Sequence, residues 1–235
     1  MHIEYIQHMH QHGIKATAAS VSGNGMDFLT GRVSYLFSLV GPTVAVHTAC
    51  SSSLVAMYFG NQDILANQVM SSTVSGVFSI LLSGTMAGIA QLNALSPEGR
   101  CKTFDISANG YGRGEGAVTF ALSEKDSTTE PYCVLKGVEM NHVGRSSGLT
   151  APNGPSQAAL IQKTMLKSGM GPNEIISLSI HGTGTSLGDP IELGGIKNSF
   201  LSSRQNSRDN LFLISSKSCL GIQKVQLDCL DACLL

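Results

Sequence analysis

The sequence predicts an α/β protein, and three observations support that fold class. The chain has 235 residues, of which 42% are hydrophobic and 13% charged, and this composition suits a globular unit with a sizeable core. Its 26 glycines and low charge favour an interior-rich α/β protein over a disordered or fibrous chain. Runs of β-type residues also alternate with amphipathic helical patterns along the chain.

The first predicted elements are helical. Four histidines precede Gly13 near the N-terminus, at His2, His8, His10 and His12. Imidazole is the commonest protein ligand for metals, but we interpret this segment as a His-rich surface helix and predict no metal site. A glycine-punctuated turn from Gly23 then leads to a second helix, whose apolar side carries Phe28, Leu29, Val33, Leu36 and Phe37.

A β-rich run over residues 44–48 ends at a turn of small residues and gives way to a helix. The helix is indicated by apolar residues near helical spacing at Leu54, Met57, Tyr58, Leu65 and Val69. Cys50 therefore lies at the first turn of a helix, where the helix dipole favours a thiolate, which is the nucleophilic form of cysteine. From these residues alone, a buried structural cysteine is the alternative.

The rest of the chain continues the alternation. We predict strands over residues 74–82, 117–122, 132–140 and 175–180, and an amphipathic helix over residues 155–169. Before the second of these strands, residues 109–116 are rich in glycine, without the Gly-Lys-Ser/Thr that would complete a phosphate-binding P-loop. We expect a tight loop beside the candidate nucleophile, in which Arg113 and Glu115 pair.

Composition and charge exclude several function classes. The net charge is −1 and no basic block occurs, so nothing indicates a nucleic-acid partner or an anionic membrane. No leader-like segment and no apolar run of 18 residues is present, so we expect a cytoplasmic protein outside the membrane. Zinc-ligand spacing is absent among the six cysteines, which we expect to be reduced: Cys50, Cys101, Cys133, Cys219, Cys229 and Cys233.

Four stretches carry a resemblance to a known family. They are TACSSS at 48–53, FD at 104–105 with YGRGEG at 111–116, GLTAPNGP at 148–155, and HGTGTSLGDP at 181–190. In order and spacing they resemble the ketosynthase domain of modular polyketide synthases, which belongs to the β-ketoacyl synthase family. The resemblance runs from about Gly23 to Gly221 and implies a thiolase-like fold, layered α-β-α-β-α and incomplete here. We expect residues 1–221 to form a partial domain, truncated at both ends, and residues 222–235 to be a tail without family resemblance.

The resemblance implies roles for individual residues. Cys50 would accept the acyl group, and His181 would help to decarboxylate the malonyl extender. Thr183 and Thr185 would hydrogen-bond the pantetheine arm of the acyl carrier, and Lys217 matches the family's lysine. His47 precedes the nucleophile closely, but on a strand it would point to the opposite side from Cys50, so we expect it to be structural.

The predicted activity is therefore that of a β-ketoacyl-[acyl-carrier-protein] synthase. This acyltransferase condenses malonyl units, with decarboxylation, onto a cysteine-bound acyl chain in polyketide or fatty acid biosynthesis. The resemblance implies no free cofactor, since phosphopantetheine is carried by the acyl carrier protein. That protein and the malonyl and acyl thioesters are the expected partners, with homodimerisation of the complete domain through residues 44–48. A thiolase-like enzyme using coenzyme A fits less well, because thiolases lack the TACSSS and HGTGT pair.

The end of the chain departs from the family pattern. After Lys217 and Ser218 the family continues Asn-Ile-Gly-His, whereas this chain has Cys219, Leu220, Gly221 and Ile222. The second active-site histidine and the glycine-rich loop that follows later in the family are missing, which would fit a truncated or mis-predicted reading frame. The alternative to an active enzyme is a catalytically inactive fragment that acts only in association or carrier contact.

Overall fold

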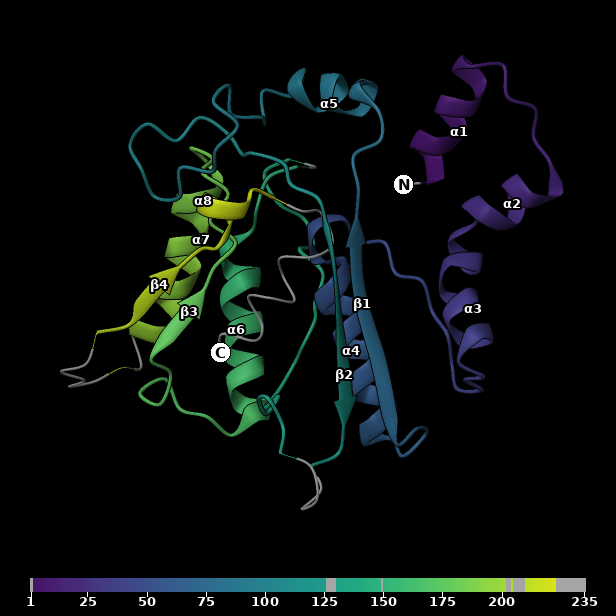
Figure 1. Cartoon of the computed structure of the whole chain (residues 1–235). Coiled ribbons are helices and arrows are strands. Elements are labelled where there is room, and N and C mark those ends of the chain that lie inside the picture. Colours follow the sequence, from purple (N-terminus) through teal and green to yellow (C-terminus); the bar gives the residue numbers. More distant parts are fainter. Residues whose placement is uncertain (1, 126–129, 149, 202–203, 205–209, 223–235) are drawn as a thin grey trace.

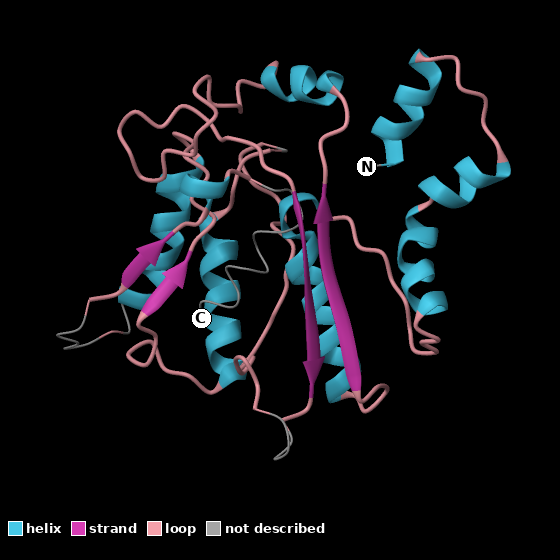
Figure 2. Ribbon diagram, viewed as in Figure 1, coloured by secondary structure: helices cyan, strands magenta, loops and turns pink. Residues whose placement is uncertain are grey.

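The chain forms two groups of elements, each built around a two-stranded sheet. The computed structural model describes residues 2–125, 130–148, 150–201, 204 and 210–222 (Figure 1). One sheet pairs β1 (Ser71–Phe78) with β2 (Gly116–Ser123), and the other pairs β3 (Ser177–Ser179) with β4 (Phe212–Ile214). Figure 2 shows helices lying alongside both sheets, so the predicted α/β class is confirmed.

The first sheet is antiparallel and packs on helix α4 (Ser52–Leu65). Its register runs from Ser71 opposite Ser123 to Phe78 opposite Gly116. Met57 of α4 and Val74 of β1 are its buried centre. Gly60 lets the helix approach closely, because a Cβ at that position would lie 2.7 Å from the Ser72 hydroxyl oxygen. The strands predicted at 74–82 and 117–122 are thus confirmed, the first shifted toward the N-terminus.

The second sheet is parallel and carries the larger core. Ile180, Ile196 and Phe200 are buried between the sheet and three helical segments: α6 (Gly154–Ser168), α7 (Gly188–Ile196) and the π-helical turn η2 (Lys197–Leu201). Full burial of such a side chain contributes about 1.5–3 kcal/mol. The side chain of Asn153 caps the start of α6, and Gly169 ends that helix with a φ of +70°. The predicted helix at 155–169 is confirmed, and the strand predicted at 175–180 is confirmed as the shorter β3.

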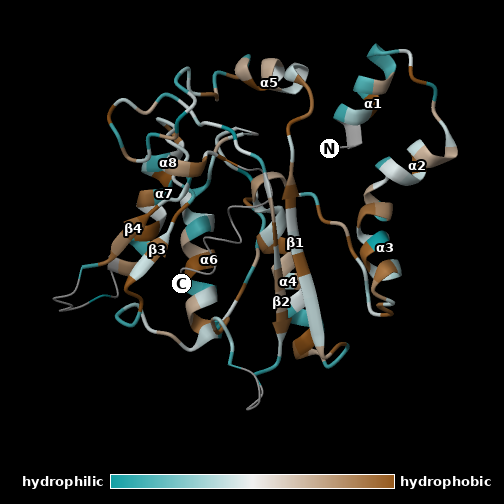
Figure 3. Cartoon of the chain, viewed as in Figure 1, coloured by the Kyte–Doolittle hydropathy of each residue, from teal (hydrophilic) through white to brown (hydrophobic). Residues whose placement is uncertain are grey.

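The N-terminal helices lie to one side of these two groups. They are α1 (His2–Gln11), α2 (Ala18–Asn24) and α3 (Met26–Leu36), and an extended segment joins them to α4 (Figure 1). The predicted helix over the Phe28 region is confirmed as α3, but its apolar side is exposed, with Leu36 73% accessible. Figure 3 shows hydrophobic residues in brown along the α3 ribbon. Glu4 of α1 reaches the main body, where its carboxylate accepts a hydrogen bond from the Leu81 amide just before α5 (Ser83–Ala90).

Two predicted strands do not form within the described residues. Residues 44–48 are extended and largely exposed, without a ladder partner in this part of the chain. Residues 132–140 run along α6, where Glu139 forms ion pairs with Lys163 (2.6 Å) and Lys167 (2.5 Å). Alternating apolar residues predict an extended backbone, but a strand also needs a neighbour for its hydrogen bonds.

No helix among the described residues is both long enough and apolar enough to cross a lipid bilayer.

Candidate active site

Cys50 lies in a single turn of 3₁₀-helix, η1 (Ala49–Ser51), that leads directly into α4. The turn is held by its own serines: the Ser52 hydroxyl accepts from the Thr48 amide (2.8 Å) and donates to the Ala49 carbonyl (2.7 Å). Ala49 adopts a left-handed φ of +58°, an uncommon conformation for a residue with a side chain. The predicted placement of Cys50 at a helix N-terminus is confirmed, and its side chain is partly exposed.

His181 follows β3 and is exposed at the start of a loop that leads to α7. The backbone of this loop is fixed by Glu192 of α7. The Glu192 carboxylate accepts hydrogen bonds from the amides of His181 (2.6 Å) and Gly182 (2.9 Å). Burial raises the pKa of Glu192, and these two hydrogen bonds act in the opposite direction. Glu192 therefore sets the position from which the His181 ring extends.

Thr183 and Thr185 face each other in the same loop. Their hydroxyl oxygens are 3.2 Å apart, and the Thr185 hydroxyl also accepts from the Gly188 amide at 3.1 Å. Thr183 is buried, whereas Thr185 is partly exposed. The two hydroxyls thus form a small polar pair at the start of α7, beside the exposed His181.

Asp189 holds the loop after His181 in place and connects it to the segment around Phe104. This buried side chain accepts from the Gly184 amide (3.0 Å) through one oxygen and from the Phe104 amide (2.9 Å) through the other. Gly184 has a φ of +74°, and a Cβ there would lie 2.6 Å from the backbone nitrogen of Lys102. The glycine is therefore required by a close backbone approach as well as by its conformation.

Lys217 is the first residue of α8 (Lys217–Leu220) and is only 1% exposed. Its ammonium group donates to the carbonyl of Ile180, the residue before His181, at 3.3 Å. Its positive charge also acts to lower the pKa of Glu192, against the effect of burial. The structure thus brings the predicted lysine to the base of the His181 loop.

A long loop between α5 and β2, residues 91–115, joins the histidine side of the site to the cysteine side. We call it the connecting loop. Its Thr103 hydroxyl donates to the Gly182 carbonyl at 2.6 Å, and its Gly110 amide donates to the Gly184 carbonyl at 3.0 Å. Burial raises the pKa of Tyr111, and the negative charge of a Cys50 thiolate raises it further, which places the phenol in the electrostatic field of the thiol.

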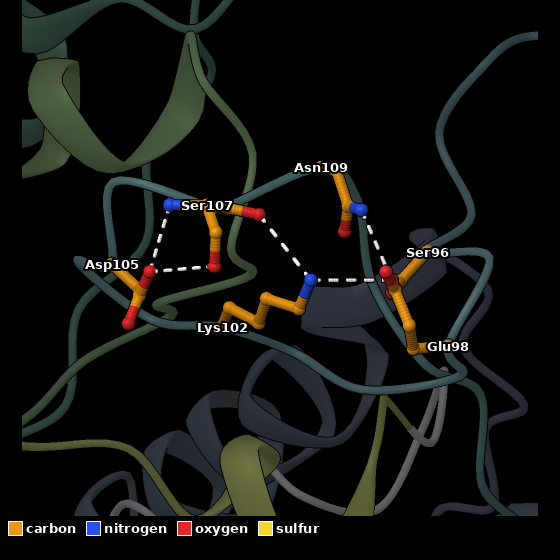
Figure 4. A network of polar contacts seen from close by, with 6 residues as sticks. All are labelled: Ser96, Glu98, Lys102, Asp105, Ser107 and Asn109. Carbon is orange, nitrogen blue, oxygen red and sulfur yellow. Dashed lines mark hydrogen bonds and ion pairs between the residues drawn. The ribbon is translucent and has the colours of Figure 1, made fainter.

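The outer side of the connecting loop is closed by an exposed polar network, drawn in Figure 4. Glu98 accepts from Asn109 (3.0 Å) and pairs with Lys102 (3.2 Å), and Lys102 also donates to the Ser107 carbonyl. Hydrogen bonds, first that from Asn109, lower the pKa of Glu98 to about 2. The network ties Glu98 to Lys102 and Asn109 within the loop.

The expected pairing of Arg113 with Glu115 is wrong. Glu115 accepts a hydrogen bond from the Ile80 amide just beyond β1, and the Arg113 guanidinium lies over the Phe78 ring, 4.8 Å from its centroid. The backbone on either side of Arg113 is bonded to Ile222, which fixes where the side chain points. The Ile80 amide, just beyond the end of β1, needs an acceptor, and it donates to the Glu115 carboxylate that we expected to pair with Arg113.

Ile222 occupies the position where the resemblance predicts a histidine. Its amide donates to the Gly112 carbonyl (2.6 Å), its carbonyl accepts from the Gly114 amide (2.9 Å), and its side chain is 3% exposed. An isoleucine side chain has neither a donor nor an acceptor, so this position supplies no side-chain hydrogen bond to a substrate.

Sequence reasoning missed Glu192 and gave Asp189 no role of its own. Both lie in the first two turns of α7, eight and eleven residues after His181. An acidic residue near a helix N-terminus was a detectable signal, but it indicates helix capping as readily as support for a loop. Among the residues that the structure describes, no three His, Cys, Asp or Glu side chains gather as metal ligands would.

Comparison with known proteins gives matches over almost the whole chain. The family profile of the beta-ketoacyl synthase N-terminal domain matches residues 2–128, and that of the C-terminal domain matches residues 132–224. The chain is 42% identical over 204 residues to a phenolphthiocerol/phthiocerol polyketide synthase of Mycobacterium tuberculosis, covering 85% of this chain and 9% of that protein. It is 40% identical over 182 residues to polyketide synthase PksN of Bacillus subtilis, covering 76% and 3% respectively.

Solved structures give the same picture. An oxazolomycin ketosynthase domain from Streptomyces albus matches with a TM-score of 0.87 at 28% identity, covering 96% of this chain and 38% of that one. The ketosynthase from module 6 of the bacillaene synthase of Bacillus subtilis matches with a TM-score of 0.85 at 30% identity, covering 94% and 40%. The chain therefore spans about two fifths of these solved chains and less than a tenth of the curated relatives.

Proposed function

Because the chain belongs to the β-ketoacyl synthase family, we propose that it carries ketosynthase chemistry with Cys50 as the acyl-accepting nucleophile. The observation that carries the proposal is the position of Cys50 in a serine-braced turn immediately before α4. The dipole of that helix favours the thiolate, and Cys50 is a partly exposed residue.

In the first step, the Cys50 thiolate attacks the carbonyl carbon of an acyl thioester. The tetrahedral intermediate collapses, the carbon–sulfur bond to the carrier breaks, and the carrier thiolate leaves and takes up a proton. The acyl group is then held on Cys50 as a new thioester. This step needs mainly a thiolate and donors for the developing oxyanion, and the N-terminal end of α4 provides a favourable field for both.

In the second step, a malonyl thioester loses carbon dioxide and the resulting enolate attacks the acyl-Cys50 carbonyl. A carbon–carbon bond forms and Cys50 leaves as the thiolate. We assign His181 to stabilising the enolate oxygen, with Glu192 holding its amide and Lys217 holding the carbonyl of the preceding Ile180. We assign Thr183 and Thr185 to hydrogen-bonding the pantetheine arm. The anchoring of the His181 and Gly182 amides on Glu192 supports this assignment.

We propose that the second step is much weaker than the first, because Ile222 cannot donate a hydrogen bond to the enolate. A positioned acid–base group typically contributes about 10²–10⁴ in rate, which corresponds to roughly 3–5 kcal/mol of barrier. The expected behaviour is slow self-acylation of Cys50 with little or no chain elongation.

The partners follow from this chemistry. They are an acyl carrier protein, whose phosphopantetheine bears the acyl and malonyl groups, and a second copy of the chain. Residues 44–48 are extended and mostly exposed, as a strand that pairs across a dimer would be. The cytoplasm is the proposed location, because Cys101, Cys133 and Cys219 are free thiols. No free cofactor is assigned to the reaction.

Two products measured on one sample test the proposal. The chain is incubated with acyl and radiolabelled malonyl carrier thioesters, while intact mass follows the acyl adduct and trapping follows carbon dioxide. Acyl adduct on the wild type, its absence in Cys50→Ala and its retention in the exposed control Cys133→Ala are expected. No adduct on a folded wild type would leave the alternative, a fragment acting only in association or carrier contact. Elongation at the rate of a complete ketosynthase would contradict the assigned effect of Ile222.

A further inference from the structure

Against the expectation from the sequence alone, we propose that His8, in the last turn of α1, and His12, one residue beyond the helix, form a two-histidine chelate for a borderline divalent transition-metal ion. The two residues are four apart, so their side chains lie on the same side of the helix. Their ring centroids are 4.2 Å apart, with a 39° angle between the ring planes. Two histidines at this spacing on one helix are an arrangement that zinc enzymes use to bind their metal.

The backbone hydrogen bond of His12 favours the ring tautomer that a metal needs. Its Nδ1 lies 2.8 Å from the carbonyl oxygen of His8. A carbonyl can only accept, so Nδ1 must carry the proton, and the Nε2 of the neutral ring is left with a lone pair. Metal-binding histidines commonly donate their second nitrogen to a backbone carbonyl, which fixes both the tautomer and the ring orientation.

The ring positions are also compatible with a shared ion. Histidine nitrogens bind such metals at about 2.0–2.1 Å, so two cis ligands have donor nitrogens roughly 3 Å apart. His12 is exposed and His8 is partly exposed, so both rings have room to turn toward a shared ion. The turn is otherwise fixed, since the His12 amide also bonds to the His8 carbonyl and Gly13 ends the helix with a φ of +63°.

The ligand set defines the class of metal. With imidazole donors and no thiolate, the site suits Zn²⁺, Ni²⁺ and Cu²⁺, and affinity should follow Ni²⁺ < Cu²⁺ > Zn²⁺. No third His, Cys, Asp or Glu joins the pair among the described residues, so water completes the coordination and exchange is fast. Glu4, one further turn back on the same face, is engaged by the Leu81 amide and does not contribute.

The test is a titration of the full chain with Cu²⁺, Ni²⁺ and Zn²⁺ by calorimetry, with electron paramagnetic resonance on the Cu²⁺ complex. We expect one ion per chain, two imidazole nitrogens in the Cu²⁺ spectrum, and the tightest binding for Cu²⁺. His8→Gln and His12→Gln should each weaken Cu²⁺ binding at least tenfold. His10→Gln is the matched control, because His10 is exposed on the same helix but at a different spacing, and it should leave the affinity unchanged.

Two results would overturn the proposal. Equal losses in the three variants would show non-specific binding to surface histidines. Loss of binding only in His2→Gln would assign the ion to the N-terminal amine and the second residue. Circular dichroism of each variant without metal shows whether the exposed substitutions leave the helix content unchanged, and none of these outcomes depends on the ketosynthase assignment.

Discussion

The turn around Cys50 and the loop around His181 are built in different ways. The Cys50 turn is held by hydrogen bonds between residues no more than four apart, from Thr48 to Ser52. The His181 loop is held by Glu192 and Asp189 from α7, by Thr103 and Gly110 from the connecting loop, and by Lys217 from α8. One is a local structure, and the other is an assembly whose hydrogen bonds join residues up to 85 apart in sequence.

This difference has a physical consequence for stability. A local turn re-forms whenever its own few residues adopt the right torsion angles, whereas an assembled loop exists only when the surrounding fold does. Substitutions that remove a contact of the His181 loop should therefore cost more, and act over a longer range, than those in the Cys50 turn. Four predictions test this comparison.

The largest effect is expected for Asp189→Asn. Asp189 is 4% exposed, and its two oxygens accept from the Gly184 and Phe104 amides. An asparagine offers one oxygen and one NH₂ group, so one buried amide would face another donor, at a cost of about 2–3 kcal/mol in the free energy of unfolding. Urea denaturation followed by circular dichroism measures the loss.

Ser52→Ala is the matched change in the Cys50 turn. It also removes a buried side chain with two hydrogen bonds, but Thr48, whose amide it frees, is an exposed residue, so water can replace the lost partner. We expect a loss of about 1 kcal/mol. A cost for Ser52→Ala equal to or above that of Asp189→Asn would invalidate the distinction between the two regions.

The same distinction explains what the sequence predicts well. The Cys50 turn, α6 and the strand leading to His181 follow from short-range patterns, and the structure confirms all three. The thiolase-like fold was predicted from four motifs, and the matches to solved ketosynthases confirm it. These features are encoded either in neighbouring residues or in a family resemblance.

The predictions that the structure does not confirm involve contacts between residues that are separated in sequence. Residues 132–140 have the alternation of a strand but lie along α6, because Glu139 within this segment forms ion pairs with Lys163 and Lys167 of the helix. Glu115 bonds to an amide 35 residues away instead of to Arg113. Glu192 was missed because its function, holding two amides of the preceding loop, appears only once α7 packs beside β3. No short window contains these partners.

An intermediate effect, visible as a pH dependence, is expected for Glu192→Gln. Burial raises the pKa of Glu192 above its ordinary 4.5, so the folded state holds this proton more tightly than the unfolded state. Stability from this group is therefore present in full below pH 4.5 and falls as the pH rises through the raised pKa. In Glu192→Gln that fall should disappear, as measured by urea unfolding at intervals between pH 4 and pH 8.

Glu98→Gln gives a control of opposite sign. The pKa of this exposed carboxylate is lowered to about 2, so its contribution is present above pH 4.5 and is lost only as the pH falls toward 2. Its removal should leave the slope between pH 5 and pH 8 unchanged. An unchanged slope in Glu192→Gln would show that Glu192 is not the buried carboxylate that this loop depends on.

The smallest effect is expected on the local side, for Ala49→Gly. Ala49 has a φ of +58°, which costs an L-residue roughly 1–2 kcal/mol, whereas glycine adopts it freely. Glycine also loses more entropy on folding, which offsets about 0.5–1 kcal/mol, so a net gain of about 0.5–1 kcal/mol remains.

The control is Ala66→Gly at the C-terminal end of α4, where φ is −83° and glycine can only destabilise. Because the Ser52 hydrogen bonds stay in place, Ala49→Gly should keep the Cys50 acylation rate of the wild type. A loss of stability as large as that of Ala66→Gly would mean that Ala49 is not strained, and that the turn before α4 owes its shape to the surrounding fold after all.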